Sequence, residues 1–275
     1  MRAILIAGLI VPAVLMPIAS GTGQEKPAPK PQQSVKPIKA LLVIGGCCHD
    51  YAKQKDILAK GISARANVEF TVAYDPDTTK KHVNPVYNNP NWANGFDVIV
   101  HDECSGDVKD LTIINRILEP HRGGMPAVLL HCAMHAYKSD GFPKVTPWVE
   151  FTGLLSTGHG AQSPIDLTFV NTDNAITKGM TNWQTIKEEL YNNANGKLLD
   201  TARPLTRGKQ GKDEYIVTWT NTYNGKANVF CTTLGHNNQT VDDPRYLTLV
   251  TRGLLWATKH LAEDGSPAPG YGPGK

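Results

Sequence analysis

The chain has 275 residues with 28 basic and 25 acidic side chains, so its formal net charge is only +3. No stretch concentrates lysine or arginine, which argues against nucleic acid or an anionic membrane as a partner. Once the N-terminal region is set aside, about 235 residues remain, enough for one domain with a sizeable core.

The N-terminus predicts export. Residues 1–21 begin with a single arginine, continue as an apolar run and end in small residues, which is the pattern of a signal peptide. Pro12 and Pro17 interrupt the run, so cleavage is favoured over an uncleaved transmembrane anchor, and no stable membrane insertion is expected afterwards. We therefore expect a periplasmic or secreted protein.

Composition divides the rest of the chain into three parts. Residues 22–37 are rich in proline, glutamine and lysine, and we expect a disordered linker there. Residues 38–262 form the predicted domain. Residues 263–275 are rich in glycine and proline and are expected to be a disordered tail.

Strands and helices alternate through the first half of the domain, which predicts an α/β fold with βαβ units on an open, mostly parallel sheet and helices on both faces. A polar loop at 75–95 interrupts this alternation, and the second half is less regular. An Asn224-Gly225 pair predicts a hairpin turn. The expected strands are 39–45, 68–74, 97–101, 126–131, 164–170, 214–221 and 227–234, and the expected helices are 53–65, 108–119 and 244–261.

Four apolar runs end on histidine, cysteine or both. In an open α/β sheet, ligands bind outside the carboxyl ends of parallel strands. If these strands are parallel, their terminal side chains converge on one edge and form a site. The groups that follow the four runs are Cys47, Cys48 and His49; His101, Asp102, Glu103 and Cys104; His131, Cys132 and His135; and Gly235 and His236.

Histidines and a carboxylate dominate the candidate chemistry. His49, His131, His159, Glu189 and His236 could supply acid–base catalysis near neutral pH, or a divalent metal site of the His/carboxylate type for zinc or manganese. The metal would be held by His49, His131 and His236. The glycine pair that ends at Gly46 permits close approach to a substrate but is too short for GxGxxG, so no nucleotide cofactor is expected.

The cysteines leave two questions open. Five cysteines in an exported chain are an odd number, and one disulfide among Cys47, Cys48, Cys104 and Cys132 is possible, with Cys231 as inert packing. A strand-to-helix turn at Cys132 could also expose a nucleophile with His236 as its base, although no glycine flanks it.

Taken in order, these motifs resemble the trehalose-utilisation (ThuA-like) family over roughly residues 38–262. The resemblance rests on Gly-Gly-x-x-His after the first strand, His131, Trp148…Gly158-His159, Ile176–Met180, Glu188–Tyr191, Thr233–His236 and Leu255-Trp256-Ala257. It implies a flavodoxin-like fold related to class I glutamine amidotransferases, without glutaminase activity, and a role in carbohydrate catabolism.

The resemblance also implies the site residues. His131, Glu189 and His236 would be catalytic, with His49, His159 and Tyr191 binding substrate. The chain departs from the family in two places: Leu130-His131-Cys132-Ala133 stands where Gly-Ile-His-Gly-Ala is common, and Glu188-Glu189-Leu190-Tyr191 stands where Asp-Glu-x-Tyr is common.

We therefore expect an exported hydrolase or lyase that acts on a glycoside or 3-keto-sugar, with a small carbohydrate as its partner. One alternative is a non-catalytic carbohydrate-binding protein, because the 75–95 loop carries asparagines beside Tyr87 and Trp92, and Trp92 would stack on the sugar. The other is a thiol amidase that uses Cys132 and His236. No oligomeric state follows from the sequence.

Overall fold

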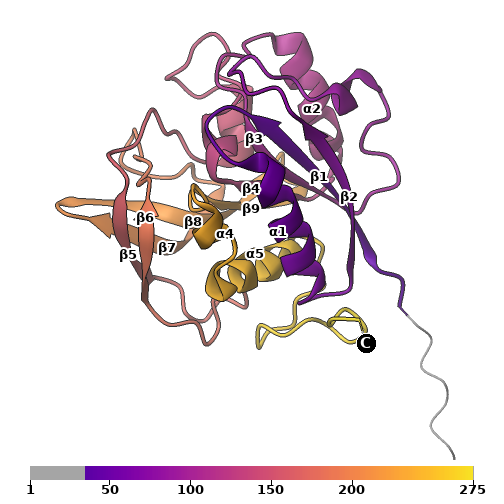
Figure 1. Ribbon diagram of the computed structural model, residues 1–275, viewed down its shortest axis with the longest axis vertical. Coiled ribbons are helices and arrows are strands. Elements are labelled where there is room, and N and C mark those ends of the chain that lie inside the picture. The colour runs from indigo at the N-terminus through magenta and orange to yellow at the C-terminus, as the bar shows by residue number, and fades with distance from the viewer. Residues whose placement is uncertain (1–34, 275) are drawn as a thin grey trace, which may run out of the picture. The chain divides into compact units, whose positions relative to one another are not determined.

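The computed structural model describes residues 35–274, so the predicted signal peptide and most of the predicted linker lie outside the described residues. In this part of the chain, no helix is long and apolar enough to cross a membrane. One nine-stranded sheet organises the domain, in the order β2-β1-β3-β4-β9-β8-β7-β5-β6 (Figure 1). Its strands are β1 (Ile38–Gly46), β2 (Val68–Asp75), β3 (Val98–Cys104), β4 (Ala127–Leu130), β5 (Ser163–Phe169), β6 (Trp183–Glu188), β7 (Ala202–Gln210), β8 (Asp213–Tyr223) and β9 (Ala227–Thr232).

The strands β2, β1, β3, β4 and β9 are parallel neighbours. The four apolar runs that end on histidine or cysteine are β1, β3, β4 and β9, and they lie side by side in that order. The expectation that their carboxyl ends share one edge of the sheet is confirmed.

The sheet is mixed rather than mostly parallel, which corrects our prediction. Strands β8, β7, β5 and β6 all pair antiparallel, and β8 pairs antiparallel with β9. The reversal at β9 comes from the tight turn at Asn224 and Gly225, both with positive φ, as hairpin turns require. Strands β6 and β7 escaped prediction because WQTIKE and ARPLTRGKQ carry too few apolar residues to stand out.

Helices cover both faces of the sheet, as predicted. Side chains alternate along β1, so that Leu42 packs in the core under α1 and α5, whereas Leu41 packs in the core under α2 and α3. Of the remaining short helices, η2 follows β4, α4 follows β9, and η1 lies within the loop between β2 and β3. The helical segments are α1 (Tyr51–Ser63), η1 (Pro85–Asn88), α2 (Leu111–Gly123), η2 (His131–His135), α3 (Pro147–Thr152), α4 (Asn238–Val241) and α5 (Pro244–Ala257).

Two segments differ from their expected ends. Helix α2 continues past Pro120 to Gly123, although proline lacks the N–H that would bond to Arg116. The Trp92 indole donates to that carbonyl instead, at 3.3 Å. The tail that we expected to be disordered lies against the domain: the backbone N–H of Asn67 donates to the carbonyl of Tyr271, and the Tyr271 ring lies 3.7 Å from that of His260.

Candidate functional site

The site begins with unusual backbone at the strand ends. His131 follows β4 directly and has a φ of 42°, and Cys48, just after β1, has a φ of 83°. Residues other than glycine rarely adopt such angles, and they persist where the surrounding structure imposes them, often at functional sites. At His131 the chain leaves β4 and enters η2, so this conformation sets the direction of the ring.

Three imidazoles meet at these ends. The ring centre of His49 lies 4.6 Å from that of His131 and 4.8 Å from that of His236, while His131 and His236 are 5.5 Å apart. One nitrogen from each ring lies within 4.8 Å of the other two. The strands β1, β4 and β9 deliver these rings, as their sequence positions predicted.

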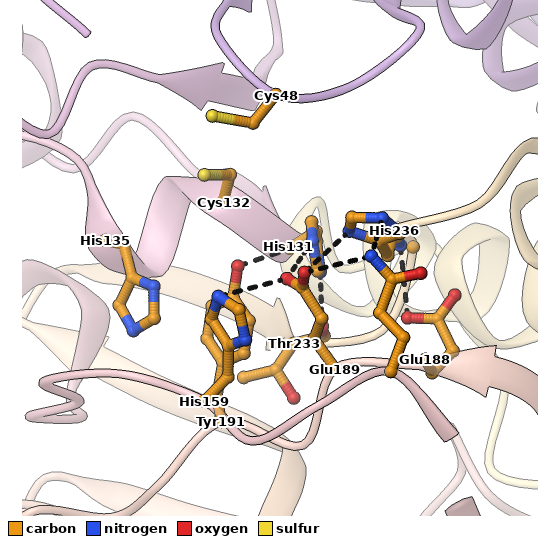
Figure 2. Close-up of polar contacts among 12 residues, drawn as sticks. Cys48, His131, Cys132, His135, His159, Glu188, Glu189, Tyr191, Thr233 and His236 are labelled. Carbon is orange, nitrogen blue, oxygen red and sulfur yellow. Dashed lines mark hydrogen bonds and ion pairs between the residues drawn. The ribbon is translucent and has the colours of Figure 1, made fainter. Parts of the chain in front are cut away.

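The Glu189 carboxylate lies among the imidazoles, at the end of β6. Its Oε2 is 3.5 Å from Nε2 of both His131 and His159, and its Oε1 is 3.2 Å from Nδ1 of His236 (Figure 2). The Tyr191 hydroxyl adds a contact of 3.3 Å to Nε2 of His131. The structure thus brings together His49, His131, His159, Glu189, Tyr191 and His236 from the predicted set.

Burial and the carboxylate shape the protonation of this cluster. Burial opposes ionisation of Glu189, yet the hydrogen bonds of His131 and His236 hold its pKa well below the usual range. The hydrogen bond to Glu189 raises the pKa of His236. Burial, aided by the two neighbouring imidazoles, lowers the pKa of His49 to about 2. The cluster therefore holds a carboxylate, a neutral imidazole at His49 and a proton-retaining imidazole at His236.

Hydrogen bonding fixes the tautomer of His131. Its Nδ1 lies 2.6 Å from the carbonyl oxygen of Thr233, and a carbonyl only accepts, so Nδ1 carries a proton. The lone pair of a neutral His131 is then on Nε2, which faces Glu189 and Tyr191. Metal-binding histidines are commonly oriented in this way by a carbonyl behind the ring.

An open cavity of about 400 Å³ lies over the cluster, within the range of small-molecule sites. His236 lines an adjoining cavity together with His49. The walls of the first cavity include Cys47, Cys48, His49, Cys104, Cys132, His135, His159, Glu189 and Tyr191.

The cysteines form two disulfides, not the single bridge that we considered. Cys47 is bonded to Cys48, and Cys104 to Cys132, while Cys231 is free and buried. A nucleophilic Cys132 would first have to be released from Cys104. The predicted inert role of Cys231 agrees with its complete burial in β9.

Three residues that the sequence suggested for the site do not offer a side chain to the cavity. Trp92 is 3% exposed and packs edge-on against Tyr87 in the core under α2, so it offers no face to a sugar. His101 lies in the same core, with Nδ1 2.9 Å from Glu103. Gly46 is backbone support: a Cβ there would lie 2.5 Å from the carbonyl oxygen of Cys104.

Sequence reasoning missed two contributors, Gln162 and Glu188, and placed a third, His135, only among the side chains that follow the apolar runs. Gln162 donates to Glu189 and lies 2.7 Å from Nε2 of His236, but an isolated glutamine before a strand gave no signal. His135 stacks on Tyr191 with ring centres 4.0 Å apart. Glu188 is fully buried and accepts from the backbone N–H of His236.

Comparison with known proteins agrees with this architecture. A ThuA-like protein from Parabacteroides merdae is 19% identical, with a TM-score of 0.60 over 85% of this chain and 97% of that one. One from Bacteroides uniformis is 14% identical, with a TM-score of 0.61 over 87% and 98%. A β-galactosidase from Rahnella sp. R3 is 11% identical, with a TM-score of 0.52 over 80% of this chain but only 31% of that one.

At these identities, the likeness establishes the fold alone. A search of curated proteins found no match. The sequence profile of the family described as "Trehalose utilisation" matches residues 39–257, which is most of the chain and includes every member of the histidine cluster. The chain therefore belongs to the trehalose-utilisation (ThuA) family.

Proposed function

We propose that this protein is a carbohydrate-processing hydrolase or lyase that acts on a glycoside or a 3-keto-sugar. The observation that carries the proposal is the meeting of three imidazoles with the Glu189 carboxylate beneath an open cavity. Membership of a family named for trehalose utilisation supports a sugar as the substrate class.

In this proposal the two ends of the cluster have opposite roles. In its neutral form His131 carries its lone pair on Nε2 and is the base, while His236, with its raised pKa, is the acid that protonates the departing sugar oxygen. Glu189 stays ionised and orients both rings. A ketone at C3 of the sugar would acidify the neighbouring C–H, so that a base and an acid suffice for elimination of the glycosidic substituent.

The donor set also fits a divalent cation such as zinc or manganese. Among residues 35–274, nothing forms a hydrogen bond with the buried Nδ1 of His49. Nδ1 of His131 is bonded to the carbonyl of Thr233, so its Nε2 is the nitrogen that faces the cluster, and His49, His131 and His236 could all be ligands. When bound, such an ion would supply Lewis-acid stabilisation of a developing oxyanion. The carbonyl of Thr233 would then support the His131 ligand from behind.

A substrate panel tests the proposal. Purified protein is incubated with glycosides and their 3-keto derivatives, after treatment with a chelator and after addition of Zn²⁺ or Mn²⁺. We expect turnover of at least one substrate and its loss in His131→Ala and His236→Ala. His260→Ala, a histidine outside the cluster, serves as the matched control. Binding without any product, unaffected by both cluster substitutions, would support the non-catalytic alternative instead.

We also propose that the protein is exported with removal of residues 1–21, on the strength of the sequence pattern alone. Expression in a bacterial host followed by fractionation tests this. We expect a mature N-terminus close to Thr22 in the periplasmic or secreted fraction, whereas an intact Met1 in the cytoplasmic fraction would contradict it.

A further inference from the structure

Four sulfur atoms form a continuous row in the wall of the cavity. The two disulfides Cys47–Cys48 and Cys104–Cys132 touch, because Sγ of Cys47 lies 3.4 Å from Sγ of Cys104. Cys48 is exposed, while the other three are no more than 7% exposed. A reagent from solvent therefore reaches this row at the Cys48 end.

Strand pairing holds the row in place. In the parallel register of β1 and β3, Gly46 lies opposite Cys104, and the backbone N–H of Cys47 donates to the carbonyl of Cys104. The positive φ angles of Gly46 and Cys48 turn the chain at this point. Figure 2 shows Cys48 and Cys132 on the same side of the histidine cluster.

We propose that this row gives the protein a second activity: thiol–disulfide exchange with an external dithiol, relayed from Cys48 to Cys132. A thiolate of the dithiol attacks Sγ of Cys48, and Cys47 leaves as a thiolate. Cys47 then attacks Sγ of Cys104, so that a Cys47–Cys104 bond forms and Cys132 leaves as a thiolate. The second thiol of the reagent attacks the mixed disulfide, releases Cys48 and closes the oxidised reagent.

The step is balanced. Two electrons and two protons pass from the dithiol to the protein, one disulfide is lost, and the two new thiols are on Cys48 and Cys132. Sγ of Cys132, Sγ of Cys104 and a nitrogen of His49 lie within 4.8 Å of one another, so the released thiol appears beside the histidine cluster. This relay does not depend on the proposed sugar chemistry.

Tryptic mapping tests the relay, because the cysteines fall on separate peptides: 40–53 holds the vicinal pair, 82–109 holds Cys104 and 123–138 holds Cys132. Full-length protein receives one molar equivalent of dithiothreitol, is quenched with acid and is alkylated with a maleimide. We expect a labelled 123–138 peptide and a disulfide-linked pair of 40–53 and 82–109, with one further label on 40–53.

Other maps would overturn the proposal. Two labels on 40–53, with 82–109 still linked to 123–138, would mean reduction without relay. Labels on 82–109 and 123–138 with an unlabelled 40–53 would mean direct attack on the buried disulfide, and the absence of any label would mean an inert row. In Cys47→Ser we expect 123–138 to remain linked and unlabelled, whereas the control Cys231→Ser should reproduce the parent map.

Discussion

The charge on Glu189 connects three imidazoles of the site, since its two oxygens contact His131, His159 and His236. In Glu189→Gln the shape is kept but the charge is lost, so His236 loses the carboxylate that raises its pKa and no longer retains its proton. We expect a fall in kcat of roughly 10²- to 10³-fold in the proposed reaction.

Steady-state kinetics on the turned-over substrate measure this effect. Glu214→Gln, the same change at an exposed position on β8, should leave kcat unchanged. A Glu189→Gln protein with full activity would remove the carboxylate from the mechanism.

Single residues were predictable from the sequence where their position on a strand decided their place. His49, His131 and His236 each follow a run of apolar residues, and parallel pairing carries all three to one edge. The place of Trp92 could not be predicted in this way, because an aromatic side chain in a polar loop can either bind a sugar or pack in a core. Only its packing against α2 shows that it belongs to the core. The disulfide partners could not be predicted either, because they depend on the register between neighbouring strands such as β1 and β3.

At the scale of elements, the turn after β1 decides where Cys47 and His49 lie. Gly46 has a φ of 95°, and a Cβ there would lie 2.5 Å from the backbone of β3. Gly46→Ala therefore combines strain with a clash, and we expect a loss of about 3 kcal/mol in the free energy of unfolding.

A second glycine, Gly95, allows the backbone strain to be measured without the clash. Its φ is 85°, but nothing lies within 4 Å of an added Cβ. Gly95→Ala should cost only about 1 kcal/mol. Urea denaturation of both variants measures the difference, and equal losses would show that the close approach of β1 to β3 carries no cost.

The C-terminal segment is a second element whose contribution can be measured. The Tyr271 ring packs against that of His260 at a tilt of 41°, and Asn67 bonds to the backbone of Gly270 and Tyr271. A chain that ends at Glu263 should lose about 1–3 kcal/mol of stability. Removal of residues 274–275 alone is the control, and a shortened chain as stable as the parent would mean that these contacts are energetically neutral.

For the whole molecule, the site combines side chains from both halves of the sheet. The parallel half supplies His49 and His131, and the antiparallel half supplies Glu189 and Tyr191. The parallel half was predictable because its strands and helices follow one another along the chain, and each has its own pattern of apolar residues. The antiparallel half was less predictable, since β5, β6 and β7 pair with strands whose register no local pattern indicates, and β6 and β7 carry few apolar residues.

Asp102 is a buried acid that makes the stability of the whole molecule depend on pH. Burial, with a smaller effect of neighbouring Glu103, raises the pKa of Asp102 to about 8. In the unfolded chain this carboxyl loses its proton near its ordinary value of 3.8. Between these two values the unfolded state is deprotonated while the folded state is not, so stability falls as pH rises, by up to about 1.4 kcal/mol per pH unit.

Asp102→Asn should remove this fall, because the amide is nearly the same shape as the protonated acid and does not ionise. We expect the variant and the parent to be about equally stable at pH 4, and the variant to be more stable by several kcal/mol at pH 8. Urea midpoints at intervals between these values measure the difference, and the comparison isolates Asp102 because the imidazoles titrate alike in both proteins. Asp264→Asn, at an exposed carboxylate, is the control; a constant difference between Asp102→Asn and the parent would show that Asp102 is already ionised in the folded protein.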